Sequence, residues 1–386
     1  MIVQSGFLLV GVVNTLLGPI LPLLSEQWRM DDAQAGRLFA AQFAGAMIGS
    51  AVSSPLIERL GAASLIAGGY GLMAAAAAVL GFSDPGLGLL AVVGLGLALG
   101  LVIPATNLLI AETNRRRRAA ALNLLNLVWG LGAVACPLLI ASLPREGGLK
   151  WLMTGLAALL TGASLMIARR PRAKLQANAD RTNQSSVKQP VWRELTGPYA
   201  LMTGALIFIY VGTETAAGGW IASYADRMGG RAQSLRSIAT SLFWAGLLTG
   251  RFLAPAFLRR VSEGALVLLS LCVAVAGLLI IIAVENPFAI FAGACLTGFG
   301  LAAVFPTTFA IFTQYFGDQA ARLAGFVFVM ASLGGAIMPW AVGLASARSG
   351  DLRIGMIVPL LGGVSMIALQ VAIILHLSRA GRQLKS

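Results

Sequence analysis

One acidic side chain, Glu214, lies in the middle of a long apolar stretch of the sequence. The chain has 15 Asp and Glu residues, and nearly all the others fall at the ends of apolar stretches or between them. An ionisable group in hydrocarbon costs from about 2.5 kcal/mol upward, so it is a functional candidate by default. A carboxyl at this place could carry a proton or accept hydrogen bonds from hydroxyl groups. The structural alternative is a protonated glutamic acid that bonds to a neighbouring helix.

Two amides and an indole stand three residues apart in another apolar stretch, at Asn123, Asn126 and Trp129. In a helix this spacing places them along one face. Amides donate to and accept from hydroxyl groups, and an indole covers an apolar face, so the set suits a hexose. The alternative is hydrogen bonding between helices, worth roughly 0.6 to 2 kcal/mol. Further amides, for which substrate contact and a structural role are equally open, are Asn14, Gln42 and Asn107.

The second half of the chain supplies aromatic side chains that could cover the apolar face of a sugar. The candidates are Tyr210, Trp220, Trp244 and Phe305. Packing against lipid or protein, or a place in an interfacial aromatic belt, is the alternative for each of them. That alternative is weaker for Trp220, which follows the glycine pair Gly218-Gly219. The glycine pair also suggests that this helix bends or unwinds during gating.

The residue types that enzyme chemistry needs are scarce. The chain has one histidine and three cysteines, and the sequence shows no phosphate-binding loop, metal-ligand cluster or nucleophile–base pair. An ATP-driven pump would need a nucleotide-binding domain, for which the chain has no room. We therefore expect no enzyme activity, no cofactor and no metal site.

The residues named so far must be positioned by helices that cross a bilayer. Of the 386 residues, 58% are hydrophobic and 11% are charged, whereas a soluble protein has about 25% charged residues. A crossing helix needs about 20 mostly apolar residues, and runs such as 72–80 lack the alternation of a β-barrel strand. The sequence predicts twelve spans, at residues 6–24, 35–57, 63–82, 87–111, 120–142, 150–168, 198–223, 236–257, 264–284, 288–314, 323–346 and 354–377.

Basic residues are distributed unequally between the two sets of connecting loops. Eighteen Lys and Arg residues fall on the side that holds both termini, nine fall on the other side, and Arg251 lies inside the eighth span. The positive-inside rule places the richer side in the cytoplasm. We therefore expect a multi-pass protein of the plasma membrane (the inner membrane of a bacterium) with both termini cytoplasmic. The net charge of +13 then follows from topology and needs no nucleic-acid partner.

The two halves of the chain resemble each other. Four Gly and Pro positions in spans 4 and 5 recur 202 residues later in spans 10 and 11; the pairs are Gly96 and Gly298, Pro104 and Pro306, Gly132 and Gly334, and Pro137 and Pro339. A polar stretch at 169–195, rich in Arg, Lys, Asn, Gln and Ser, separates the halves. We expect an N-terminal six-helix bundle at 1–168, a cytoplasmic linker at 169–195, a C-terminal six-helix bundle at 196–378 and a cytoplasmic tail at 379–386.

Twelve spans, a basic central loop and a six-plus-six repeat resemble the major facilitator superfamily over essentially the whole chain. The stretch from Ser54 to Gly61 is similar to that family's G-x-L-x-D-R-x-G signature, with Ser54 in place of Gly and Glu58 in place of Asp. The resemblance implies an all-α membrane protein of two pseudo-symmetric six-helix bundles. It also implies that Glu58 and Arg59 lock one conformation by pairing with a neighbouring helix end.

A narrower resemblance points to the fucose:proton symporter group, whose relatives include sodium-dependent glucose transporters. The stretches that carry it are Gln34-Ala35-Gly36, the pair Asn123 and Asn126, Tyr210 to Thr215 with Gly218-Gly219-Trp220, and Gly250-Arg251-Phe252 followed by Arg259-Arg260. One departure is that fucose symporters carry acidic residues in spans 1 and 4. Here span 1 offers Asn14, and residues 103–107 of span 4 hold no carboxylate, so the coupling chemistry of the group does not transfer directly.

Two more charged side chains are candidates for conformational control. Glu112 lies at the cytoplasmic end of span 4 close to the arginines at 115–118, and we expect a gate or a structural ion pair there. Arg251, near the inner end of span 8, can snorkel or pair across the two halves.

These observations favour a monomeric secondary active transporter that imports a monosaccharide, such as glucose, galactose or fucose, by ion symport through alternating access. Glu214 is the expected proton carrier, and sodium is a live alternative because span 1 lacks a carboxylate. The second hypothesis is an exporter of drug-like or amphipathic compounds, favoured by the high apolar and methionine content. A membrane receptor or scaffold fits poorly, since it needs neither a carboxylate at mid-depth nor matched kinks.

Overall fold

The computed structural model is built of α-helices throughout its described residues, which are 2–114, 117–143, 147–169, 197–228, 233–284 and 286–383. The predicted linker at 169–195 lies, beyond Arg169, outside the described residues, and so does the end of the predicted tail. The chain divides into two compact units: unit 1 comprises Met1–Arg29 and Leu38–Lys188, and unit 2 comprises Met30–Arg37 and Gln189–Ser386. Each unit is described by itself below.

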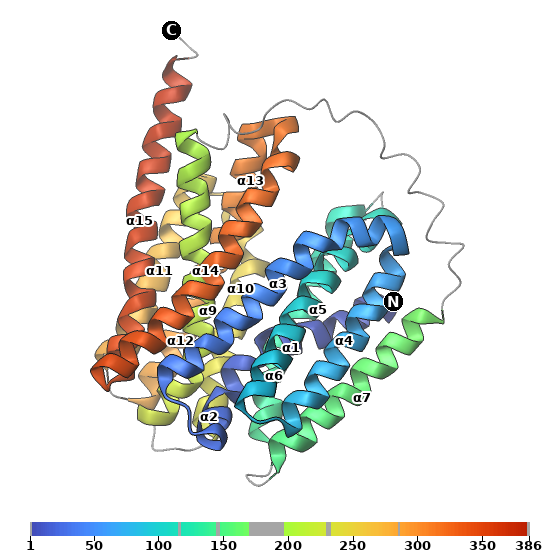
Figure 1. Ribbon diagram of the computed structural model, residues 1–386. Coiled ribbons are helices and arrows are strands. Elements are labelled where there is room, and N and C mark those ends of the chain that lie inside the picture. Colours follow the sequence, from blue (N-terminus) through green and yellow to red (C-terminus); the bar gives the residue numbers. More distant parts are fainter. Residues whose placement is uncertain are drawn as a thin grey trace. The chain divides into compact units, whose positions relative to one another are not determined.

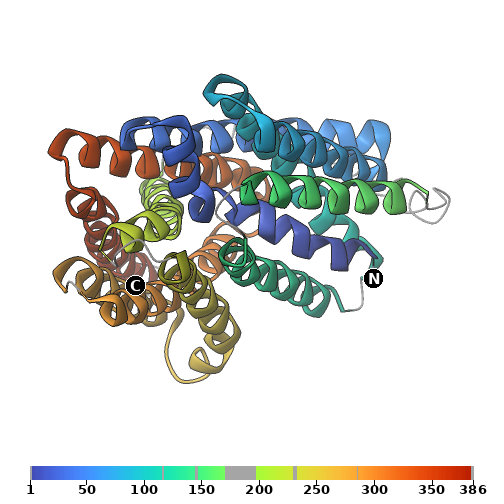
Figure 2. The same cartoon turned by 90° about the horizontal axis from the view of Figure 1, so that it is seen from below.

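The helices of the first half follow the six predicted spans, the first of which is made of two helices (Figure 1). Their bounds are α1 Ile2–Thr15, α2 Leu17–Trp28, α3 Asp32–Leu60, α4 Ala62–Phe82, α5 Pro85–Thr113, α6 Arg118–Ala141 and α7 Gly148–Ala168. Helix α4 packs against α5 and α7, as the view from below shows for α7, and α1 packs against α6 (Figure 2). The first predicted span is bent by 44° between α1 and α2.

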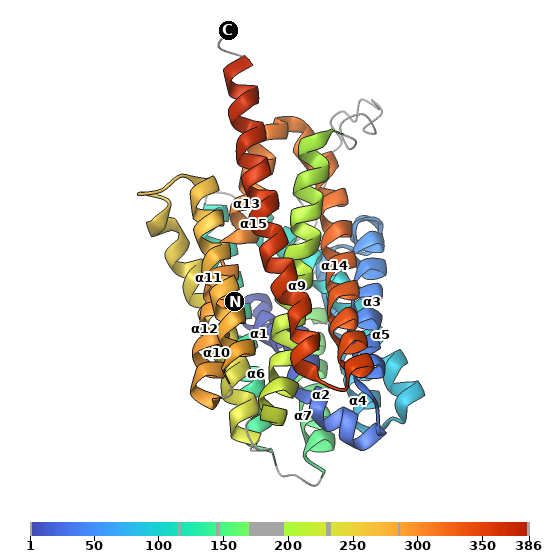
Figure 3. The ribbon, with the colours of Figure 1, turned by 90° about the vertical axis from the view of Figure 1, so that its left-hand side faces the viewer.

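The helices of the second half are α9 Pro198–Met228, α10 Gln233–Phe257, α11 Glu263–Ala283, α12 Pro287–Leu301, α13 Val304–Phe316, a short 3-10 turn η4 Gly317–Gln319, α14 Ala320–Ser349 and α15 Leu352–Gln383. Helix α9 packs against both α14 and α15 (Figure 3). Helix α10 packs against α12, and α12 against α11. The tenth predicted span is interrupted between α12 and α13.

Proline explains both interruptions. Proline lacks the N–H that would bond to the carbonyl four residues earlier, and its ring crowds that carbonyl. Pro19 therefore leaves the Thr15 carbonyl without its helical partner where α1 ends, and Pro306 does the same to Ala302 between α12 and α13. A carbonyl without its helical partner is tolerated at membrane depth only where protein or water satisfies it, and Thr15 and Ala302 are both buried.

The length and composition of the helices identify eleven of the twelve predicted spans. Within the described residues, ten helical stretches are long and apolar enough to cross a membrane, or eleven when the bent pair α1–α2 is counted as one span. Helix α10, which carries the eighth predicted span, is not among them; it contains Arg251 and several hydroxyl side chains. The predicted all-α fold is confirmed.

The repeated glycines have the same structural role in both halves. A Cβ atom added to Gly96 of α5 would lie 1.9 Å from the Gln42 carbonyl of α3, and one added to Gly298 of α12 would lie 1.9 Å from the Phe243 carbonyl of α10. The same holds for Gly132 against Leu8, at 2.1 Å, and for Gly334 against Phe208, at 1.9 Å. Helix backbones can approach this closely only where a side chain is absent. The sequence repeat therefore marks equivalent close contacts between helix backbones in the two halves.

The first turn of α3 is fixed by its own side chains and by unit 2. A capping box closes the turn, since the Gln34 N–H donates to Asp31 Oδ1 at 2.7 Å and the Asp31 N–H donates to Gln34 Oε1 at 3.1 Å. Asp32 accepts a hydrogen bond from Arg227 Nη1 of α9 at 2.9 Å and another from the Ser346 hydroxyl of α14. These contacts all lie within unit 2.

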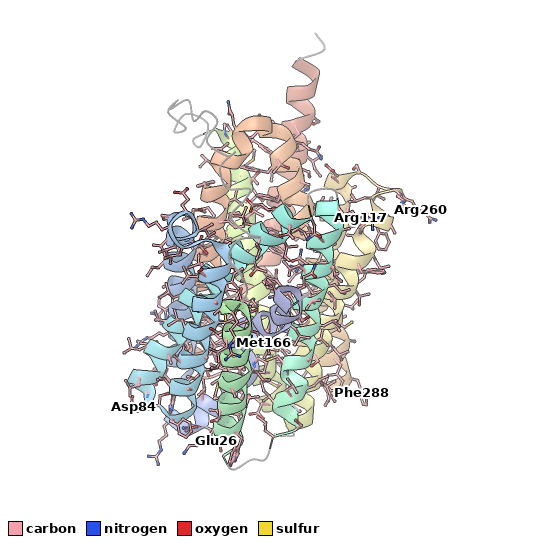
Figure 4. The ribbon with its side chains drawn as sticks, turned by 90° about the vertical axis from the view of Figure 1, so that its right-hand side faces the viewer. Glu26, Asp84, Arg117, Met166, Arg260 and Phe288 are labelled. Atoms are coloured by element: carbon pink, nitrogen blue, oxygen red, sulfur yellow. The ribbon has the colours of Figure 1, made fainter. Side chains whose placement is uncertain are left out.

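Charged residues mark opposite ends of each unit (Figure 4). In unit 1, Arg117 lies at one end and Glu26 and Asp84 lie at the other. In unit 2, Arg260 lies at the end opposite Phe288. Each unit thus has one labelled arginine at one of its ends.

We expect Gly298→Ala to destabilise the protein by about 1–3 kcal/mol, because the new methyl group meets a backbone carbonyl that cannot rotate away. The matched control is Gly68→Ala on α4, where an added Cβ meets nothing within 4 Å; it should be neutral or stabilising by roughly 0.5–1 kcal/mol. Thermal unfolding of the purified protein in detergent measures both. Equal unfolding temperatures for the two variants would contradict this role of Gly298.

Candidate functional site

Unit 1 presents an amide face on α6. The side chains of Asn123 and Asn126 are exposed and that of Trp129 is half-buried, and their three-residue spacing keeps them on one side of the helix. An amide exposed to hydrocarbon would lack partners for its polar atoms and cost several kcal/mol. Both asparagines are exposed on the surface of unit 1, and their contact with a polar ligand stays a prediction.

The other predicted amides of unit 1 are less available. Gln42 of α3 is buried at the wall of a small, mostly apolar cavity that Val13, Ile20 and Val92 also line. Asn107 of α5 is half-buried, and its Nδ2 donates to the Ile103 carbonyl of its own helix at 2.9 Å. Asn14 of α1 is half-buried as well. Substrate contact by these three residues stays a prediction.

In unit 2, Glu214 has a charged partner. Arg251 Nη2 of α10 lies 3.8 Å from Glu214 Oε1 of α9, which is within ion-pair range but too long for a hydrogen bond. The expectation of a carboxylate standing alone in the membrane is wrong. Arg251, which the sequence allowed either to snorkel or to pair across the halves, pairs here with Glu214 of its own unit.

The buried side chain of Tyr210 completes this charged group. It lies one helical turn before Glu214 on α9, near the charges of Glu214 and Arg251, and its hydroxyl completes no hydrogen bond within the described part of the chain. The side chains of Glu214 and Arg251 keep 15% and 30% of their surface exposed. The carboxylate therefore lies beside a guanidinium and a phenol and is partly exposed.

The helix break between α12 and α13 lies beside this group. A Cβ atom added to Gly250, the neighbour of Arg251, would lie 2.5 Å from Ala302 Cβ and 2.8 Å from the Phe299 carbonyl. The ring of Phe305, at the start of α13, lies 6.0 Å from the ring of Tyr210. Gly250 therefore allows α10 to bring Arg251 close to an interrupted helix whose Ala302 carbonyl has lost its helical partner to Pro306.

Two of the predicted aromatic contacts are packed inside unit 2. Trp220 is fully buried, and its Nε1 donates to the Pro339 carbonyl of α14 at 2.9 Å. Trp244 is buried edge-on to Phe243, with ring centroids 5.1 Å apart. In this conformation both indoles pack within the protein, as the structural alternative predicted, and neither ring is available to a sugar.

The glycine pair at 218–219 does not interrupt its helix. Helix α9 runs without a break from Pro198 to Met228. An added Cβ on Gly218 would lie 2.9 Å from the Phe243 ring and 3.1 Å from the Trp244 ring. Close packing against α10 thus accounts for Gly218 in this structure.

The predicted conformational locks lie at helix ends. Glu58 and Arg59 are exposed in the last turn of α3, and Glu112 is half-buried in the last turn of α5. None of the three forms an ion pair with another residue in the described ranges. Arg115 and Arg116 lie outside those ranges, so the pairing of Glu112 with them stays a prediction.

Two aromatic side chains that the sequence analysis did not single out extend the row from Tyr210. Phe305 stacks on Phe309, with ring centroids 5.9 Å apart and planes 4° from parallel. Phe309 contacts Phe328 of α14 at 5.9 Å. The signal that could have found them is the repeat, because Phe309 and Phe328 lie 202 residues after Asn107 and Asn126.

Among curated proteins, the chain is similar to several transporters over most of its length. It is 25% identical to the uncharacterized MFS-type transporter YfkL of Bacillus subtilis, an alignment that covers 90% of this chain and 89% of the relative. It is 23% identical to the glucose/mannose transporter GlcP of the same bacterium, covering 87% and 85%. It is 19% identical to the mouse sodium-dependent glucose transporter 1A, covering 91% and 90%.

Solved structures of transporters share the fold. The nucleoside transporter NupG superimposes with a TM-score of 0.70 at 18% identity, over 97% of this chain and 96% of the other. FucP in the outward conformation gives a TM-score of 0.66 at 19% identity, over 96% and 97%. A family model described as Major Facilitator Superfamily matches residues 5–339. With its fold, its repeat and this match, the chain belongs to the major facilitator superfamily and is a membrane transporter, not an enzyme.

Proposed function

We propose that the protein is a secondary active transporter that imports a hexose by proton symport through alternating access, with Glu214 as the proton carrier. The observation that carries the proposal is the group formed by Tyr210, Glu214 and Arg251 in the membrane-spanning part of unit 2. The presence of glucose and mannose transporters among the relatives supports a sugar as substrate. Cytoplasmic termini and a monomeric state remain predictions.

The charge of Glu214 can control its contact with Arg251. An ionised carboxylate attracts the guanidinium at 3.8 Å, and this attraction is stronger in the low-dielectric interior than in water. Protonation removes the attraction and turns the carboxyl into a hydrogen-bond donor. A proton bound at Glu214 therefore frees Arg251, and a change in this contact is the step by which the proton gradient acts on the transporter.

The neutral polar groups are suited to the sugar itself. Asn123 and Asn126 offer donors and acceptors on an exposed surface of unit 1, which match the hydroxyl groups of a hexose. Phe305, next to Tyr210 in unit 2, offers an aromatic face, which matches the C–H side of the ring. The Glu214 carboxylate can also accept a hydrogen bond from a sugar hydroxyl while it lies beside Tyr210 and Arg251.

Sodium is the less favoured coupling ion. A sodium ion needs several oxygen ligands, and the freed Ala302 carbonyl and Glu214 could supply two of them. However, the guanidinium of Arg251 already occupies the positive position next to Glu214, and a second cation there would be repelled. The proton needs no such room, because it binds to the carboxylate covalently.

We expect Glu214→Gln to abolish sugar accumulation driven by a proton gradient and to leave sugar exchange across the membrane, because glutamine keeps the shape but cannot bind or release a proton. The measurement is radiolabelled glucose and galactose uptake into proteoliposomes, with a proton gradient and, separately, a sodium gradient. Accumulation by the variant at the wild-type level would remove Glu214 from the mechanism, and accumulation driven by sodium alone would replace the proton.

A double variant distinguishes two possible roles of Glu214, which are to carry a proton and to neutralise the charge of Arg251. Glu214→Gln leaves the guanidinium without its counter-charge, which is itself destabilising. The double variant Glu214→Gln with Arg251→Gln removes both charges and relieves that cost. If the double variant regains proton-driven accumulation, Glu214 only balances Arg251; if accumulation stays absent while exchange persists, Glu214 carries the proton.

The substrate class can be tested on the unmodified protein by thermal unfolding in detergent. A ligand that binds only the folded state stabilises it by about 1.4 kcal/mol at ten times its Kd. We expect glucose or galactose at millimolar concentration to raise the unfolding temperature by a few degrees, with mannitol as a matched polyol control. Stabilisation by lipophilic cations, without any by hexoses, would instead favour an exporter of amphipathic compounds.

A further inference from the structure

The repeat allows residue positions in one unit to be compared with those in the other. Residues of α5 and α6 correspond to residues of α12, α13 and α14 that lie 202 positions later in the sequence. The repeated glycines of these helices make equivalent backbone contacts in the two units. The hydroxyls of Thr106 and Thr308, which also differ by 202, are both buried and complete no hydrogen bond within the described part of the chain. Residues 107 and 309, and residues 126 and 328, are therefore structural equivalents.

The equivalent positions carry opposite chemistry. Asn107 and Asn126 are amides in unit 1, whereas Phe309 and Phe328 are aromatic rings in unit 2. The degree of exposure is retained, since Asn126 and Phe328 are exposed while Asn107 and Phe309 are half-buried. The two rings contact each other at 5.9 Å, with planes inclined by 48°.

The face that Phe328 occupies is the face that Asn126 identifies as water-facing. An exposed amide is not stable against hydrocarbon, so position 126 meets water, and the repeat assigns the same side of α14 to position 328. Phe328 exposes 51% of its surface there. An aromatic ring that faces water loses the free energy of burial, and a ligand that covers the ring restores it.

The ring of Phe328 is also connected to the charged group. Phe309 touches Phe328, Phe305 stacks on Phe309, and Tyr210 lies 6.0 Å from Phe305. The aromatic row therefore runs from Phe328 to the residue that lies near the charges of Glu214 and Arg251. A ligand held on this row lies along the path that leads to the proton carrier.

We propose that Phe328, supported by Phe309, is a substrate-binding residue that stacks on the apolar C–H face of the transported hexose. The assignment rests on the proposed function and adds to it the side chains that recognise the C–H face of the sugar. Sugars whose C–H bonds gather on one side of the pyranose ring are the preferred substrates.

The first test asks whether position 328 meets water or lipid. A cysteine-free protein is made by replacing Cys136, Cys272 and Cys295, and Phe328→Cys is introduced into it. The matched control keeps only the native Cys272, which is exposed on α11. A hydrophilic maleimide reacts with a thiol in water and not with one in hydrocarbon. We expect rapid labelling of Phe328→Cys and slow labelling of Cys272; equally slow labelling of both overturns the proposal.

The second test asks whether the ring binds sugar. Phe328→Leu keeps an apolar side chain of similar size and removes the ring, whereas Phe328→Tyr keeps the ring. We expect Phe328→Leu to raise the KM for glucose or galactose transport roughly three- to tenfold with little change in kcat, and Phe328→Tyr to resemble the wild type. Phe288→Leu, at a ring that is 77% exposed at the start of α12, is the control and should leave KM unchanged.

The outcomes distinguish this proposal from the proposed function. If the wild type transports a hexose and Phe328→Leu has the wild-type KM, the stacking role is wrong while the sugar transporter stands. A loss of unfolding temperature shared by Phe328→Leu and Phe328→Tyr, without the split in KM, would assign Phe328 to packing. If the wild type transports no hexose, the proposed function fails, and the sugar-binding role of Phe328 fails with it.

Discussion

A charge in the hydrocarbon of a membrane must be balanced, and this constraint governs the site in unit 2. Glu214 and Arg251 lie on neighbouring helices and balance each other at 3.8 Å. Gly250, next to Arg251, lets α10 approach the end of α12, and Pro306 lies just beyond the break that follows α12. Ion pair, helix break and aromatic row are therefore parts of one arrangement, in which a change of protonation alters the force between two helices.

Backbone contacts at glycine hold the helices of each unit in register. In four places a helix backbone approaches a repeated glycine so closely that no side chain could stand there. Such contacts replace the hydrophobic driving force, which is absent between helices in lipid. They also explain why α10 can be a spanning helix despite its polar content, because its contact with α12 is made by backbone atoms.

Length and composition were enough to predict the twelve spans, since each needs only an apolar run of sufficient length. The pairing of Glu214 with Arg251 was missed because they lie on different helices with a loop between them, and sequence spacing carries no information about contact between helices. Trp220 was predicted at the sugar because it lies near Glu214 in sequence, yet its side chain is buried against α14. Phe328 was overlooked because an aromatic residue in an apolar span resembles packing until its exposure and its repeat partner are known.

The equivalence of positions 126 and 328 has a consequence for how such a molecule can diversify. A duplicated ancestral half begins with two identical surfaces, and any later change must leave the helix contacts intact. Here the glycines that fix those contacts are the same in both copies, while residues about two to three turns away are amides in one copy and rings in the other. The residues that set the helix contacts are thus distinct from the residues that differ between the copies, so the exposed chemistry of a unit can change without rebuilding its helix packing.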